Sequence, residues 1–164
     1  GRMTPREQVL ARLDAMGVPY TLEEHPAVFT IEEMEKLGIN RRGEVCKNLF
    51  LRDQKGRRHF LVVLPGEKRA DLEALRLQLG SSKLGFASAQ RLEQHLGLHQ
   101  GEVTPMGVLN DREHTVEVVF DRQLEGFPVL GVHPNDNTAT LWMTFADIRR
   151  VVEQNGNPIS YVEL

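Results

Sequence analysis

The strongest indication of a fold in this sequence is the segment 44–51, which is apolar at both of its alternating sets of positions. In a β-strand, successive side chains point to opposite faces, so both faces of this segment would be apolar. A strand of this kind is buried on both sides and lies near the middle of a sheet. A turn at 53–56 and a second apolar run at 59–64 follow, so residues 44–64 are predicted to form a β-hairpin.

Capping residues and hydrophobic periodicity divide the rest of the chain into helices and strands. Helices are predicted over residues 5–16, 31–37, 69–79, 89–96 and 145–154, and further strands over 18–24, 84–87, 115–120, 129–132, 138–143 and 158–164. Several of these strands are joined as hairpins and do not alternate regularly with helices. The pattern therefore predicts an α+β fold, with a mixed, largely antiparallel sheet and surrounding helices in a single domain.

Length and composition exclude several classes of protein. A chain of 164 residues is the size of one domain. Gly1 and Arg2 precede Met3 and could be an added remnant, which leaves 3–164 as the predicted domain. The longest uninterrupted apolar run, 60–64, is far shorter than the roughly 20 residues of a membrane helix, so no membrane partner is expected. A net charge of −3 argues against a protein that coats long nucleic acids.

The single cysteine, Cys46, excludes an intramolecular disulfide and a zinc site built from several cysteines. Nothing in the chain resembles a secretory leader, so a cytoplasmic location is expected. The pair His95 and His99 has the spacing of metal ligands, but Gly97 interrupts the helix that would align them. No metal site is therefore predicted.

Lys47 is the anomalous residue of the central strand, because burying an unpaired ammonium group is costly. One interpretation is a cleft in which an anionic ligand compensates the charge. The other is a side chain that reaches solvent at a sheet edge. The pattern alone leaves both open. Cys46 points to the opposite face and is interpreted as a structural residue, not a nucleophile.

Two loops carry further candidate residues. The loop 101–105 begins with a glycine and ends with a proline, and it is either the wall of a small pocket or a plain connector. His133 follows the strand predicted over 129–132, where it could bind substrate or transfer protons, although histidines are equally common in surface turns.

Taken together, residues 46–51, the G-x-x-x-P loop 101–105 and the segment 131–135 resemble three motifs of a known family, as does the segment 83–87. This family is the YbaK-like aminoacyl-tRNA deacylases, relatives of the editing insertion domain of bacterial prolyl-tRNA synthetases. The likeness extends from about Thr4 to Leu164. Within the family, the chain is most similar to freestanding members that remove alanine from proline tRNA.

The resemblance implies an α+β fold and hydrolysis of the ester that joins a wrong amino acid to the tRNA 3′ end. It implies no metal and no other cofactor, because the neighbouring ribose hydroxyl of the tRNA helps to position water. Lys47 would orient the tRNA end and polarise the site, and Asn48 would support it. The residues expected to shape the pocket and hold the aminoacyl group are Gly101, Thr104, Pro105, Gly131 and His133.

The expected partners are the acceptor end of a mischarged tRNA and a prolyl-tRNA synthetase. Three alternatives remain. The amino acid removed could be cysteine, serine or 2-aminobutyrate. The chain could be a non-catalytic module that binds tRNA ends or a synthetase. It could also be a small-molecule esterase, which the absence of a G-x-S-x-G motif disfavours.

Overall fold

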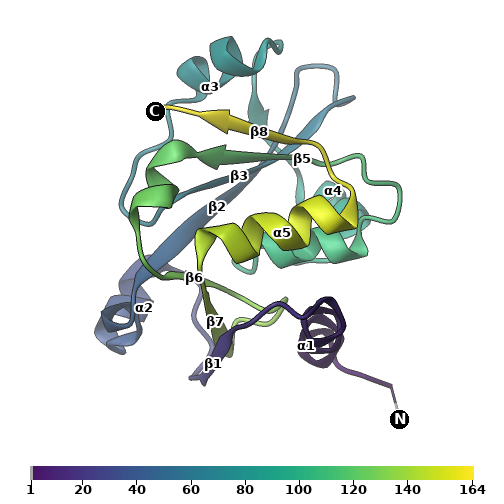
Figure 1. Ribbon diagram of the computed structural model, residues 1–164. Coiled ribbons are helices and arrows are strands. Elements are labelled where there is room, and N and C mark those ends of the chain that lie inside the picture. Colours follow the sequence, from purple (N-terminus) through teal and green to yellow (C-terminus); the bar gives the residue numbers. More distant parts are fainter. Residues whose placement is uncertain (1) are drawn as a thin grey trace.

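The computed structural model describes residues 2–164, which form one mixed β-sheet with helices on both faces (Figure 1). The helices are α1 (Pro5–Met16), α2 (Ile31–Lys36), α3 (Leu72–Leu79), α4 (Ala89–Leu96) and α5 (Phe145–Asn155), with short 3-10 helices η1 (Ile39–Arg41), η2 (Pro105–Asn110) and η3 (Arg122–Gly126). The strands are β1 (Thr21–Glu24), β2 (Glu44–Arg52), β3 (His59–Pro65), β4 (Gly85–Phe86), β5 (Glu117–Asp121), β6 (Leu130–Val132), β7 (Ala139–Met143) and β8 (Ile159–Val162).

The sheet has the strand order β1-β7-β6-β2-β3-β5-β8, and the short strand β4 pairs separately with β2. The pairs β1–β7, β6–β7, β2–β3 and β2–β4 are antiparallel, whereas β2–β6, β3–β5 and β5–β8 are parallel. Strand β2 lies in the middle and crosses the whole molecule (Figure 1). The predicted α+β class, mixed sheet, hairpin and central strand are confirmed.

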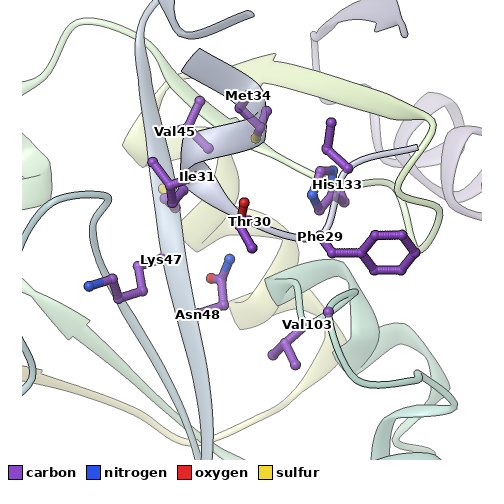
Figure 2. Close-up of a pocket in the computed structure, with 12 residues that line it drawn as sticks. Phe29, Thr30, Ile31, Met34, Val45, Lys47, Asn48, Val103 and His133 are labelled. Atoms are coloured by element: carbon purple, nitrogen blue, oxygen red, sulfur yellow. The ribbon is translucent and has the colours of Figure 1, made fainter. Parts of the chain in front are cut away.

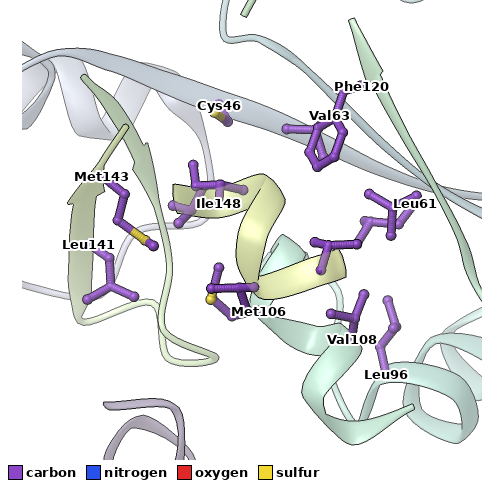
Figure 3. Packing of buried hydrophobic residues seen from close by; sticks show 14 of the residues in the cluster. Cys46, Leu61, Val63, Leu96, Met106, Val108, Phe120, Leu141, Met143 and Ile148 are labelled. Carbon is purple, nitrogen blue, oxygen red and sulfur yellow. The ribbon is translucent and has the colours of Figure 1, made fainter. Parts of the chain in front are cut away.

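The core is divided by the sheet. On one face, α1, α4, α5 and η2 pack against the sheet, and Figure 3 shows Leu96, Met106 and Ile148 meeting residues such as Leu61 and Phe120. On the other face, α3 covers a second cluster that contains Leu51, Phe60 and Leu75. A third, smaller cluster lies beneath α2. Alternate side chains of β2 and β3 enter the clusters on the two faces of the sheet. This explains why both faces of the hairpin are apolar.

Side-chain caps set the helix boundaries. The Thr4 hydroxyl accepts from the backbone N–H of Glu7, and the Glu7 carboxylate accepts from the Thr4 N–H, which completes a capping box at α1. Gly17 ends the same helix in the left-handed region, at φ 68°.

Three predicted boundaries were wrong for local reasons. Helix α3 begins after Asp71, not at residue 69, because the Asp71 carboxylate caps the N–H of Ala74. Strand β1 begins at Thr21, not at residue 18, because the N–H of Val18 still bonds to the carbonyl of Leu13 in the helix end. The loop expected over 101–105 ends one residue earlier, since Pro105 is already the first residue of η2.

Candidate active site

The candidate site lies where the central strand β2 is paired with a neighbouring strand on one side only. On one side, residues 46–52 pair with β3. On the other side, among the described residues, β2 pairs with β6 only at Glu44 and Val45 and with β4 only at Leu51 and Arg52. The edge of the strand between these two contacts is therefore open on that side.

The backbone groups of this open edge point outward from the strand. The N–H of Glu44 donates to the Val129 carbonyl at 3.0 Å, and the Phe50 carbonyl accepts from the Ala87 N–H at 3.0 Å. Alternate residues of a strand direct their peptide groups to the same side, so the peptide groups of Cys46 and Asn48 face the same opening. The opening thus exposes main-chain donors and acceptors as well as side chains.

A pocket of about 180 Å³ occupies this position. It lies between the segment that enters α2, the edge of β2, the loop after α4 and the end of β6 (Figure 2). Its lining residues are Val28, Phe29, Thr30, Ile31, Met34, Val45, Cys46, Lys47, Asn48, Gly101, Val103 and His133. The volume is smaller than that of sites for drug-sized ligands, and the walls are largely apolar, so the pocket suits a small group.

Lys47 is half-buried, and its ammonium Nζ donates to the carbonyl oxygen of Lys68 at 2.7 Å. Because β2 is central, Lys47 does not lie on an edge strand of the sheet, although part of its side chain reaches solvent. A carbonyl compensates part of the charge, and two of the three ammonium N–H donors remain. Figure 2 shows the Lys47 and Asn48 side chains leaving opposite faces of β2, so these consecutive residues approach the pocket from its two sides.

The carbonyl that receives Lys47 is itself held in place. The N–H of Lys68 donates to the Pro65 carbonyl at 3.1 Å, which closes a turn after β3. The Lys68 ammonium pairs with the buried carboxylate of Asp121 at 2.6 Å. This chain of contacts joins Lys47 to the end of β5.

Asn48 contributes an unused acceptor. Its side-chain oxygen Oδ1 is buried and has no hydrogen-bond partner within residues 2–164. Buried polar atoms are rarely left unpaired, so this oxygen indicates a position for water or ligand. Asn48 also lines a recess of about 10 Å³ next to the pocket, together with Gly131, His133 and Thr140. This recess has room for about one water molecule.

His133 lies on the far side of the pocket and presents one free ring nitrogen. Its Nδ1 lies 2.9 Å from the carbonyl oxygen of Ala139, and a carbonyl only accepts, so Nδ1 carries the proton. Burial lowers the pKa of His133, which favours the neutral imidazole. The other nitrogen, Nε2, is therefore an acceptor.

Gly101 also lines the pocket, as predicted for the loop 101–105. It adopts φ 84°, and a Cβ atom at this position would lie 2.7 Å from the Cδ1 atom of Phe29. The glycine thus lets the Phe29 ring pack against the loop, and this ring is 59% exposed at the pocket mouth.

The other three predicted residues lie behind the lining of the main pocket. Thr104 is fully buried, and its hydroxyl donates to the His133 carbonyl at 2.6 Å, which joins the loop to the end of β6. Pro105 is buried at the start of η2. Gly131 lines only the recess, and a Cβ atom there would lie 2.7 Å from the Trp142 ring. Substrate contact by these residues stays a prediction, and the geometry gives each a packing role.

Several lining residues were not predicted, namely Val28, Phe29, Thr30, Ile31 and Met34. Thr30 was recognised only as a helix cap, and nothing local in the sequence shows that this helix start faces the open edge of β2. Cys46 is fully buried, and burial raises the pKa of its thiol, which agrees with the structural role predicted for it.

Within residues 2–164, no group of three or more histidine, cysteine, aspartate or glutamate side chains is arranged to hold a metal ion. Over the same part of the chain, no helix is long and apolar enough to cross a membrane.

The sequence is similar to those of several known proteins. Residues 25–151 match the model of the family described as "Aminoacyl-tRNA editing domain". The chain is 48% identical to the prolyl-tRNA editing protein ProX of Acetoanaerobium sticklandii, over 99% of both chains. It is 38% identical to prolyl-tRNA synthetase associated domain-containing protein 1 of Danio rerio, over 91% of this chain and 82% of that protein.

A similar fold occurs in the crystal structure of a candidate trans-editing enzyme for prolyl-tRNA synthetase, with a TM-score of 0.75 and 19% identity. The match covers 100% of this chain and 99% of that one, and it bears on the fold alone. The resemblance seen in the sequence motifs and the fold it implied are both confirmed. The chain belongs to the aminoacyl-tRNA editing domain family, and with it to the enzymes that hydrolyse aminoacyl-tRNA esters.

Proposed function

We propose that this protein hydrolyses the ester bond of mischarged proline tRNA, with alanine as the amino acid removed. The observation that carries the proposal is the small pocket at the open edge of β2, which contains Lys47, Asn48 and His133. The high identity to a prolyl-tRNA editing protein over nearly the whole chain supports the choice of tRNA. The acceptor end of the tRNA is the proposed partner, and the cytoplasm, where tRNA is charged, is the proposed location.

Alanine fits the physical need for such an enzyme. A synthetase pocket built for proline cannot strongly reject a smaller amino acid, because missing methylene groups cost only about 1–3 kcal/mol of binding. A second, smaller site can hydrolyse the wrong aminoacyl ester that the synthetase has made. The pocket here is small, and Ile31, Met34 and Val103 make its walls apolar, which suits a methyl side chain. Cysteine, serine and 2-aminobutyrate are only slightly larger and are the competing substrates.

The mechanism we propose needs no nucleophilic side chain. Water in the recess would donate one hydrogen bond to Asn48 Oδ1 and one to His133 Nε2, which leaves an oxygen lone pair directed at the ester carbonyl carbon. Attack forms the new C–O bond, the ester C–O bond to the ribose breaks, and the water proton passes to the departing ribose oxygen. The neighbouring ribose hydroxyl of the substrate assists this transfer.

Lys47 would act by charge and position. Its two remaining N–H donors would bind the anionic tRNA end, while the Lys68 carbonyl fixes the direction of the side chain. A fixed ammonium group near developing negative charge stabilises the transition state more than the ground state. A prolyl-tRNA synthetase is proposed as a further partner, because this protein must act on the product of that enzyme.

The proposed function predicts a selective pattern of deacylation. Alanine should be released from proline tRNA at least about tenfold faster than proline, since its methyl side chain needs less room in the pocket than the pyrrolidine ring, and the rate should survive exhaustive chelation. The measurement is single-turnover hydrolysis with alanyl, seryl, cysteinyl, 2-aminobutyryl and prolyl esters of the same tRNA. Faster release of another small residue would change the substrate. Binding without hydrolysis of any ester would indicate the non-catalytic alternative, and hydrolysis of simple esters alone would indicate the esterase.

A second prediction concerns Lys47. Lys47→Ala should lower the single-turnover rate about a hundredfold, or about 3 kcal/mol at the transition state, with little change in melting temperature. Lys47→Arg should restore little activity, because a planar guanidinium cannot replace a compact ammonium. Cys46→Ala is the matched control and should keep most activity. An active Lys47→Ala variant beside an inactive Cys46→Ala variant would contradict the mechanism and favour a covalent one.

A third prediction follows from the unpaired oxygen of Asn48. Asn48→Ala removes the acceptor that holds the water, so kcat should fall about tenfold or more while KM changes little. Asn40→Ala, at an exposed position outside the pocket, is the control and should behave as the wild type. If Asn48→Ala raises KM and leaves kcat unchanged, the residue binds substrate and does not position water.

A further inference from the structure

A second polar cleft lies at the other end of the β2–β3 hairpin. His59 is paired with Arg52, which is five residues along β2 from Lys47 and therefore about 17 Å away at ~3.3 Å per residue. The cleft has a volume of about 500 Å³. It is lined by Gly56, Arg57, His59, Ser88, Gln90, Arg91, Gln94, His95, Glu113 and Thr115. None of these residues belongs to the pocket beside Lys47.

Arg91 places a partly buried positive charge in this cleft. Its guanidinium Nη1 lies 3.0 Å from the Gly56 carbonyl oxygen and 3.0 Å from His59 Nε2. An arginine only donates hydrogen bonds, so His59 Nε2 accepts and its proton lies on Nδ1. Among the ion pairs of residues 2–164, none includes Arg91 or Arg57. A partly buried cation without a counter-charge is costly, and a bound anion would compensate it.

Two neighbouring histidines, His59 and His95, lie beside Arg91 in the cleft. The ring centroids of His59 and His95 lie 4.0 Å apart, and His59 stacks on Phe50 at 5.7 Å. Burial lowers the pKa of His59 to about 4, and the charges of His95, Arg91 and Arg52 add to this effect, against the opposing carboxylate of Asp53. The cleft therefore disfavours further positive charge and favours a negative ligand.

We propose that this cleft binds a phosphate group, with Arg91 and Arg57 as its cationic ligands and the side-chain amides of Gln90 and Gln94 as further donors. Arginine suits this role because its planar fork matches phosphate oxygens. Glu113 is the one carboxylate in the lining, and it is exposed to solvent, which screens its repulsion.

The phosphate could come from two sources, a nucleic-acid backbone or a free phosphate ion. The separation of about 17 Å from Lys47 equals roughly five stacked nucleotides at ~3.4 Å each. A nucleic-acid strand of about five nucleotides that starts at the open edge of β2 would therefore be long enough to reach the cleft. Only the nucleic-acid source rests on the proposed function, whereas binding of a free phosphate ion does not.

The test is an NMR titration that follows the imidazole signals of His59 and His95, first with inorganic phosphate and then with uncharged proline tRNA. We expect a saturable shift of both signals. Arg57→Gln, which removes a charge without breaking a hydrogen bond of the fold, should weaken binding at least about fivefold, and Arg91→Gln should abolish it. Arg149→Gln, an equal loss of charge on α5, is the control and should bind as the wild type.

Saturation by both ligands or by tRNA alone supports a backbone phosphate site, and saturation by phosphate alone supports a site for the free ion. Failure of both to shift the signals overturns the proposal, as does equal weakening by Arg57→Gln and Arg149→Gln. If Arg91→Gln does not fold, the exposed Arg57 still provides the test. The readout is binding, so the phosphate site can stand even if no mischarged tRNA is hydrolysed.

Discussion

The interaction on which the rest of the site depends is the unequal pairing of the central strand β2. On one side, residues 46–52 of the strand pair continuously with β3, which ties the two halves of the sheet together. The other side is paired only at its ends, by β6 and β4. The gap leaves main-chain donors and acceptors of β2 available to water or to a ligand. The same strand is thus both the centre of the fold and the floor of the pocket.

The alternation of this strand explains how two consecutive residues serve one site. Lys47 and Asn48 leave opposite faces of β2, yet both border the gap at its edge (Figure 2). Lys47 is directed by a carbonyl whose own position depends on the Lys68–Asp121 ion pair. Asn48 and His133 both line the recess, and each brings a hydrogen-bond acceptor without a partner among the described residues. In the proposed mechanism, separate parts of the fold would therefore hold the charge and the water.

Much of this could be predicted from the sequence, because the signals are local. Caps such as Thr4 and Ser88 mark helix starts, and the apolar faces of 44–51 identify the central strand. Lys47 stood out because a charge in that strand needs compensation. The family resemblance added the hydrolytic reaction, which no spacing in the chain reveals.

What the sequence could not predict depends on contacts between distant segments. Phe29 and Ile31 reach the pocket only because the start of α2 and the loop after α4 meet over the gap in β2. The Trp142 ring packs on Gly131, where a side chain would collide with it. The Thr104 hydroxyl donates to the His133 carbonyl. Both contacts join segments that are distant in the sequence, so the sequence motifs do not reveal them.

The central claim is that the reacting end of the tRNA occupies the open edge of β2. The most direct measurement is the change in backbone amide signals when the protein binds a non-hydrolysable analogue, adenosine with alanine joined through a 3′ amide. The account predicts that the largest changes occur at Asn48, Gly101 and His133, with little change at the amides of β8. Saturable binding with its largest changes elsewhere, and none at these three residues, would contradict it.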